Sequence, residues 1–131
     1  MNLILDAALT CYGQTGVART TLDQVAREAG VTRTTLYRYV NNRNDLFDKV
    51  LHRDALQVQD EMNALIRAQP DFGAAIIESM LYNIRGRMTR PINKIIFAEH
   101  DAGAPGAPQL LAENFYDLAY PTIEGLSLIH I

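Results

Sequence analysis

The residue types best suited to chemistry gather in one stretch of the sequence, residues 20–43 (TTLDQVAREAGVTRTTLYRYVNNR). Arg33, Thr34, Thr35 and Arg38 are spaced so that they remain largely outward on a short helix once its apolar residues are buried. Their guanidinium and hydroxyl groups donate hydrogen bonds to base edges and phosphates. A short helix with this outer face is suited to the major groove of DNA.

Two short helices and a tight turn must position these side chains. Thr21 and Gln24 have the spacing of a capping box, which begins a helix. Gly30 ends that helix because glycine readily adopts a positive φ, and Thr32 is placed to cap the next one. This is helix-turn-helix spacing. A plain helical hairpin with a charged outer face is the alternative, but the caps, the turn glycine and the basic face together favour DNA binding.

The residues after the motif predict where its second helix ends and the next one begins. Helical spacing places Leu36 and Val40 on the inner face of that second helix. Asn41 and Asn42 break the helix, and Asn42 is placed to cap the long helix that follows.

Helical periodicity extends over almost the whole chain, and no strand-like alternation is present. We expect helices at about 2–14, 21–30, 32–40, 43–68, 71–89, 91–101 and 108–120, with a loop at 102–108. The expected fold class is all-α. An N-terminal three-helix domain with a helix-turn-helix would bind DNA, and a partial helical regulatory domain would follow it.

The composition excludes several protein classes. Among the 131 residues, 48% are hydrophobic, which is enough for a core and argues against a disordered tail. The one cysteine, Cys11, cannot form an intramolecular disulfide, and we expect it to be a small core residue. No apolar run reaches the roughly 18 residues needed to span a membrane. The first residues lack the basic region of a signal peptide, so the expected location is cytoplasmic.

The net charge of −3 hides a division between the two parts of the chain. Residues 1–53 contain seven basic and five acidic side chains, a net charge of +2, whereas residues 54–131 contain five basic and ten acidic ones. This asymmetry indicates a basic module attached to an acidic one.

Over roughly residues 3–50 the sequence resembles the TetR family of transcriptional regulators. The resemblance is carried by ILDAAL at 4–9, Gly16, TTL at 20–22, VAREAGV at 25–31, TLYRYV at 35–40 and NDLF at 44–47. The combination of Ala-Gly-Val, the Leu-Tyr pair and the following charged-then-leucine step is highly specific to that family.

The resemblance implies DNA contacts from the start of each helix of the motif. Thr21 takes the position at which the family caps its second helix and often touches a phosphate. Arg33, Thr34 and Thr35 fall on the base-reading edge of the recognition helix.

Four further positions are implied at the end of the motif and just beyond it. Tyr37 and Arg43 fall where family members contact the phosphate backbone. Tyr39 falls at a second groove-side position, with packing against the first helix as an equal alternative. Arg38 lies at a variable position, and we assign it to phosphate.

For the whole protein, the resemblance implies a bacterial transcription regulator that acts as a repressor. Two copies, as a homodimer, would present recognition helices about one helical turn apart, roughly 34–36 Å, to a palindromic double-stranded operator. A small-molecule effector would shift the population toward a state of low DNA affinity by moving the fourth helix.

The second half of the chain resembles the start of the family's regulatory domain, which usually encloses a small-molecule pocket. Weak candidates to line such a pocket are Met62, Met80, Ile84, Phe97 and Tyr116, although each is more often a plain core residue. Arg85, Arg87 and Arg90 form a basic cluster, which we interpret as the solvated end of a helix.

Domain boundaries follow from the same resemblance. We expect a DNA-binding domain at 1–48 and an incomplete ligand-binding and dimerisation domain at 49–125. Family members usually carry a basic arm before the first helix, and here either that arm is lacking or the start of the sequence is misplaced. Relative to the family, we also expect two or three helices at the end to be missing. The last six residues, 126–131 (LSLIHI), match the translation of a transposon-end sequencing adapter, and we exclude them from functional reasoning.

Two other functional classes remain as alternatives: a helix-turn-helix module of a recombinase or sigma-like factor, and a purely structural helical protein. An enzyme is not expected. Glu99, His100 and Asp101 are neighbours and would point in different directions on a helix. His52 and His100 have no cysteine or histidine at metal-binding spacing, and no cofactor motif is present.

Overall fold

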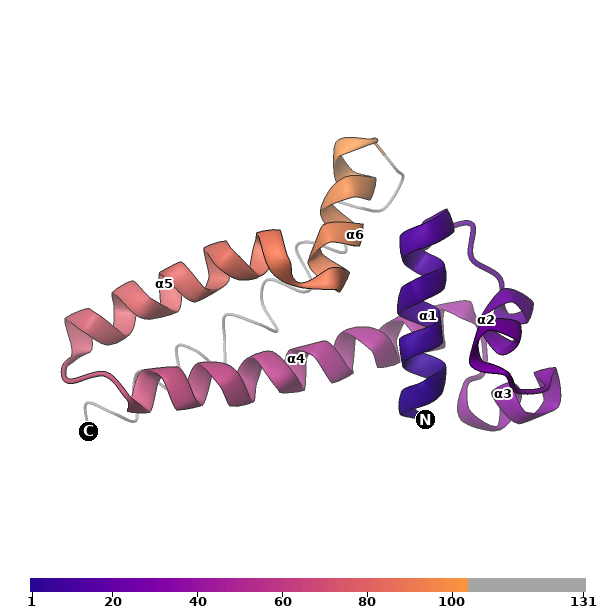
Figure 1. Cartoon of the computed structure of the whole chain (residues 1–131), viewed down its shortest axis with the longest axis horizontal. Helices are drawn as coiled ribbons and strands as arrows, with labels where there is room; N and C mark the ends of the chain where they lie inside the picture. Colours follow the sequence, from indigo (N-terminus) through magenta and orange to yellow (C-terminus); the bar gives the residue numbers. More distant parts are fainter. Residues whose placement is uncertain (104–131) are drawn as a thin grey trace. The chain divides into compact units, whose positions relative to one another are not determined.

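The computed structural model describes residues 1–103, and the chain divides into two compact units, Met1–Arg53 and Asp54–Ile131. The described part is helical (Figure 1), with α1 at Asn2–Thr15, α2 at Leu22–Ala29, α3 at Arg33–Tyr39, α4 at Arg43–Arg67, α5 at Phe72–Thr89 and α6 at Pro91–Asp101. The all-helical prediction is confirmed, and each expected boundary of these six helices falls within one residue of the observed one. The expected loop begins at residues 102 and 103, which form a turn after α6. The rest of that loop, the helix expected at 108–120 and residues 126–131 lie outside the described residues.

The first unit is built on α1, which packs against α2. The buried residues of α1 include Leu5, Ala8, Cys11 and Tyr12. The ring of Phe47 from α4 meets that of Tyr12 edge to face, with 5.7 Å between centroids. These contacts hold the start of α4 against α1, so the helices on either side of the helix-turn-helix form one apolar core.

Polar contacts also fasten α1 within the first unit. Its C-terminal residue is followed by Gly16 at φ 84°, a left-handed conformation that favours glycine. The Nη1 atom of Arg53, near the unit's C-terminal boundary, lies 2.7 Å from Oδ1 of Asp6. Burial raises the pKa of the Cys11 thiol, with a smaller contribution from the Glu28 charge, so this thiol stays protonated at neutral pH and fits the core role expected of it.

The second unit contains the later part of α4 together with α5 and α6. Met62 and Ile66 of α4 pack with Ala75 of α5 in a buried cluster, against which Leu65 and Tyr82 lie. The side chain of Asp71 caps α5 by accepting a hydrogen bond from the Ala74 amide at 2.9 Å. The cluster fixes α5 alongside the second half of α4 (Figure 1).

The described residues lack both a membrane-spanning helix and a metal-binding group of side chains. Between residues 1 and 103, no helix combines the length and apolar character needed to cross a bilayer. The same part of the chain contains no group of three or more His, Cys, Asp or Glu side chains placed to hold a metal ion.

Candidate nucleic-acid interface

The start of α2 is fixed by the capping box that the sequence predicts. Oγ1 of Thr21 accepts a hydrogen bond from the Gln24 amide at 3.2 Å, and the Thr21 amide donates to Oε1 of Gln24 at 2.8 Å. Thr21 is exposed and Gln24 is half-buried, and the Thr21 hydroxyl still has its own proton to donate. Thr21 is therefore held at the surface in a geometry that leaves a donor for an outside group.

The turn between α2 and α3 depends on Gly30, whose φ of 69° and ψ of 27° are left-handed. Its amide donates to backbone carbonyls at the end of α2, which closes that helix. Thr32 then caps α3 by accepting from the Thr35 amide at 3.2 Å. A second contact joins the hydroxyls of Thr32 and Thr35 at 2.9 Å.

Burial sorts the residues of α3 into an inner and an outer set. Leu36 is fully buried, as are Val25 of α2 and Val40 after α3. They fill the space beneath the recognition helix. The outer set comprises Arg33, Thr34, Tyr37, Arg38 and Tyr39, all of which are exposed. Tyr39 keeps 45% of its surface, so its ring is not enclosed by the core.

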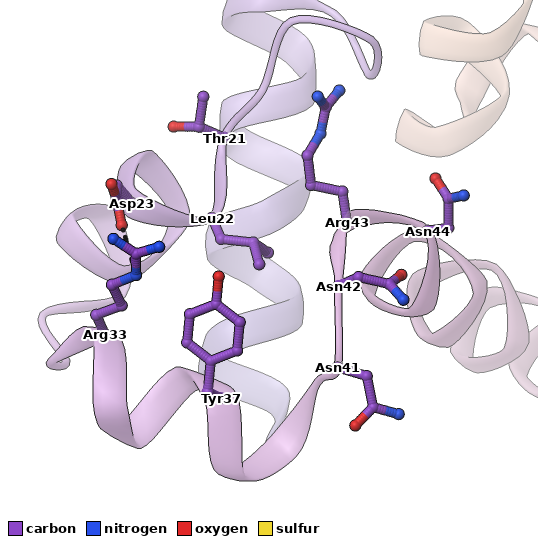
Figure 2. Close-up of a pocket in the computed structure, with 9 residues that line it drawn as sticks. All are labelled: Thr21, Leu22, Asp23, Arg33, Tyr37, Asn41, Asn42, Arg43 and Asn44. Carbon is purple, nitrogen blue, oxygen red and sulfur yellow. Dashed lines mark ion pairs between the residues drawn. The ribbon is translucent and has the colours of Figure 1, made fainter.

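A hollow of about 400 Å³ lies between the start of α2, the outer face of α3 and the start of α4 (Figure 2). Its lining is polar apart from one leucine and consists of Thr21, Leu22, Asp23, Arg33, Tyr37, Asn41, Asn42, Arg43 and Asn44. Figure 2 shows the Tyr37 hydroxyl pointing toward Leu22 across the hollow. The residues thus offer hydroxyl, amide and guanidinium donors on one surface.

Arg33 is oriented by two neighbours at this surface. Its Nε lies 3.5 Å from Oδ1 of Asp23, an ion pair between α3 and α2 that is drawn dashed in Figure 2. Its guanidinium carbon is 5.5 Å from the centroid of the Tyr37 ring, within the range of a cation–π contact. A hydrogen bond with Tyr37, followed by the charge of Asp23, raises the pKa of Arg33. The guanidinium is therefore charged and held near the ring.

Arg43 lies at the hollow but directs its guanidinium elsewhere in the structure. Nη2 donates to the carbonyl of Ala18 and, at 3.4 Å, to that of Val17. These carbonyls belong to the segment between α1 and α2. Arg43 therefore braces that segment in this structure, and any phosphate contact would use its remaining donors.

Asn42 caps α4, as the sequence predicts. Its Oδ1 accepts a hydrogen bond from the Asp45 amide at 2.9 Å. The Asp45 carboxylate accepts in turn from Nζ of Lys49 at 2.6 Å and from the Asn41 amide at 2.8 Å. The bond from Lys49, then that from Asn41, lowers the pKa of Asp45. This network fixes the chain as it passes from α3 into α4.

The structure brings together part of the predicted DNA-binding set. Thr21, Arg33, Tyr37 and Arg43 line one hollow, although they come from three helices and their flanking turns. Thr34, Arg38 and Tyr39 lie exposed on α3 outside that lining. Thr35 is the residue least suited to its predicted role, because it is half-buried and its hydroxyl is paired with that of Thr32.

Besides Leu22, four polar residues that line the hollow lie outside the predicted DNA-binding set. Asp23 was not singled out, since an acid in the first turn of a helix needs no further explanation. Asn41 and Asn42 were interpreted as a helix break, with Asn42 as a cap, and Asn44 was considered only as part of the family resemblance. The clustering of amide side chains in NNRN is the signal that marks this surface as polar beyond what a turn requires.

The candidate effector residues do not form one group in the described part of the chain. Met62 is buried in the core of the second unit, whereas Met80 and Ile84 are exposed on α5. Phe97 is half-buried, with the guanidinium carbon of Arg87 4.1 Å from its ring centroid. Tyr116 lies outside the described residues. The effector pocket therefore stays a prediction.

The interpretation of Arg90 as part of a solvated helix end is wrong. Its side chain is only 13% exposed, because it bridges the helices of the second unit. Nη2 lies 3.0 Å from Oδ1 of Asp54, and Nη1 lies 3.2 Å from Oε2 of Glu61 and 3.0 Å from the Tyr82 hydroxyl. Tyr82 also donates to Glu61. We name Asp54, Glu61, Tyr82 and Arg90 the Arg90 cluster.

Comparison with known proteins matches the first unit to one family of regulators. Residues 4–50 match the bacterial regulatory proteins of the tetR family. The HTH-type transcriptional regulator AcrR of Shigella flexneri is 43% identical over 47 residues, which are 36% of this chain and 22% of that protein. The chain therefore matches less than a quarter of that relative's length.

Solved structures extend the similarity of fold. A TetR family transcription regulator from Marinobacter aquaeolei superposes with a TM-score of 0.67 at 18% identity, covering 97% of this chain and 66% of the other. SmeT, the repressor of a multidrug efflux pump of Stenotrophomonas maltophilia, gives a TM-score of 0.62 at 21% identity, covering 95% and 61%. These two structures show the same helical fold. Residues 4–50 of this chain therefore match the tetR family of bacterial regulatory proteins, and the solved structures agree with that match in fold.

Proposed function

We propose that this protein binds duplex DNA through the outer face of α3 and the hollow beside it, and that it regulates transcription as a repressor. The observation that carries the proposal is the sorting of α3: Leu36 is fully buried while Arg33, Thr34 and Arg38 are exposed. A helix held by one buried leucine and presenting guanidinium and hydroxyl groups outward has the composition that reads a major groove.

Contacts to phosphate would come from the rim of the same surface. The Thr21 hydroxyl has a proton to donate, and Tyr37 is 42% exposed with its hydroxyl at the hollow. Such contacts fix register on the duplex, while base contacts from Arg33 and Thr34 supply specificity. We expect Thr35 to contribute chiefly by holding the start of α3 with Thr32.

The full regulator would act as a homodimer on a palindromic operator. Two recognition helices spaced by about one helical turn, roughly 34–36 Å, would engage its half-sites. A small-molecule effector, held by the second unit, would favour a state with lower DNA affinity. That SmeT is a repressor supports repression here, and the acidic balance of residues 54–131 supports a role for the second unit other than DNA binding.

The sharpest test of the proposed base contact is Arg33→Ala. The preferred duplex is first selected from a random-sequence pool with the full chain, and affinity is then measured for it and for mixed-sequence duplex. If Arg33 reads a base, the variant loses about 1–3 kcal/mol on the selected sequence and much less on the mixed one. Equal losses on both would make Arg33 a phosphate contact instead.

Arg38→Ala is the matched control, since Arg38 is an exposed arginine of the same helix that does not line the hollow. We expect similar losses on both duplexes, as for a phosphate contact. Failure of the wild-type chain to enrich any sequence from the pool would contradict sequence-specific binding.

A further inference from the structure

Asp23 is the one acidic side chain among the residues that line the hollow, where every neighbour is neutral or basic. A carboxylate on a surface that faces phosphates opposes binding through charge repulsion. Its presence at this site is therefore unfavourable for affinity, and its contact with Arg33 offers a reason for it to be there.

The geometry of that contact is loose. The Nε–Oδ1 separation is 3.5 Å, and the side chains of Arg33 and Asp23 are 65% and 58% exposed. Ion pairs this exposed contribute little to folding stability. The contact is made through Nε, so it leaves the two Nη groups of Arg33 available. A bidentate contact to guanine needs two N–H donors of the guanidinium together.

Tyr37 limits the guanidinium from another side, with its ring centroid 5.5 Å from the guanidinium carbon. Asp23 and Tyr37 thus restrain an otherwise flexible side chain between α2 and α3 (Figure 2). A restrained arginine loses less entropy when it meets a correctly placed base. It is also less free to swing toward a nearby phosphate.

We propose that Asp23 is a specificity-determining residue, which holds Arg33 for base contact and withholds it from non-specific phosphate contact. The inference rests on the proposed DNA-binding function. It assigns to Asp23 a repulsive role, and specificity commonly depends on such an element as well as on attractive ones.

The test compares wild type, Asp23→Asn, Arg33→Gln and the double variant in the full chain, with mixed-sequence duplex as the probe over a range of salt concentrations. Asp23→Asn should bind this duplex about 3- to 10-fold more tightly at low salt, and its log–log salt slope should steepen by about one, the effect of one added phosphate contact. In the Arg33→Gln background, the same substitution should leave the slope unchanged.

Glu28→Gln is the matched control, since Glu28 is an exposed acid on α2 that does not line the hollow. It removes the same charge and should change affinity less than 2-fold, with no change in slope. Thermal unfolding of each variant checks that the fold is intact. The inference would be overturned if Asp23→Asn bound the mixed-sequence duplex with the same affinity and the same salt slope as wild type. It would also be overturned if the full gain in affinity persisted in the Arg33→Gln background.

The outcome also separates this inference from the function on which it rests. If wild type binds duplex but Asp23→Asn behaves like Glu28→Gln, only the role of Asp23 is wrong. If wild type binds no duplex at low salt, the proposed function itself is wrong, and the role of Asp23 is wrong with it.

Discussion

Two arginines of this chain, one in each unit, show how burial decides what a charged side chain does. Arg33 is 65% exposed and has one loose carboxylate neighbour, Asp23, at 3.5 Å. Arg90 is 13% exposed and contacts Asp54 and Glu61 at 3.0 and 3.2 Å, as well as Tyr82. The first remains accessible to a partner outside the chain, whereas the second is committed to contacts within it.

Burial and the contacts of Arg90 with its neighbours also shift the pKa values of these side chains. Burial acts to lower the pKa of Arg90, but the bond and charge of Asp54 outweigh it, so the pKa is raised. Burial first, and then the bond to Glu61, raises the pKa of Tyr82 to about 12. Arg90 therefore stays charged and Tyr82 stays protonated at neutral pH, which keeps both as donors to the carboxylates between α4, α5 and the turn before α6.

The largest effect on stability is expected from the residue beneath the exposed arginine. Leu36→Ala should lower the free energy of unfolding by about 3 kcal/mol, because Leu36 is fully buried and its truncation leaves a cavity. Urea unfolding measures this loss. Arg33→Ala in the same assay should stay within about 0.5 kcal/mol of wild type. A comparable loss from both variants would show that Arg33 is structural, like Arg90.

Removal of the partly buried Arg90 side chain is expected to have the next largest effect on stability. Arg90→Met keeps the aliphatic stem but leaves Asp54 unpaired, and it should cost about 2 kcal/mol. This loss in the free energy of unfolding is smaller than for a fully buried ion pair, because the Glu61 side chain is 42% exposed. The matched control is Arg85→Met, an exposed arginine of α5, for which urea unfolding should detect almost no change. Equal stability of the two variants would remove the distinction between the arginines.

The smallest expected effect is the contribution of Glu61 to the pH dependence of folding stability. Bonds from Tyr82 and Gln57 lower the pKa of Glu61 from its ordinary 4.5, with Arg90 adding to them against the effect of burial. A carboxyl whose pKa is depressed on folding contributes stability above its unfolded pKa and loses it as pH falls through the folded one.

Wild type should therefore exceed Glu61→Gln in stability at pH 6 by less than about 1 kcal/mol, since the group is partly exposed. The difference should shrink as pH is lowered below 4.5. Asp60→Asn, a change at the exposed neighbouring acid, is the control for the loss of one negative charge from α4. A constant difference across that range in chemical unfolding would contradict a charge-dependent role for Glu61.

Local sequence signals were sufficient to predict the helices of residues 1–103 and part of the lining of the hollow. Capping pairs act over three residues, so Thr21 with Gln24 and Asn42 before Asp45 could be found by spacing alone. Leu36 was assigned to the core because helical periodicity leaves it on the inner face of α3. These features depend on neighbours in sequence, which is why they were accessible.

The contacts that could not be predicted join residues distant in sequence. Arg43 reaches carbonyls 25 and 26 residues earlier, and Arg90 reaches Asp54 across 36 residues. Asp23 meets Arg33 only because Gly30 turns α3 back toward the start of α2. Sequence composition shows that such charges are present, but only the tertiary arrangement shows which of them are paired.

The proposal that the α2–α3 surface of this chain binds duplex DNA is tested most directly by the affinity of the full chain for mixed-sequence duplex between about 50 and 200 mM salt. Binding should be measurable at the lower concentration and should weaken steeply as salt rises, since phosphate contacts release counterions. Absence of duplex binding at the lowest salt, or binding indifferent to salt, would contradict a DNA-binding role for this surface.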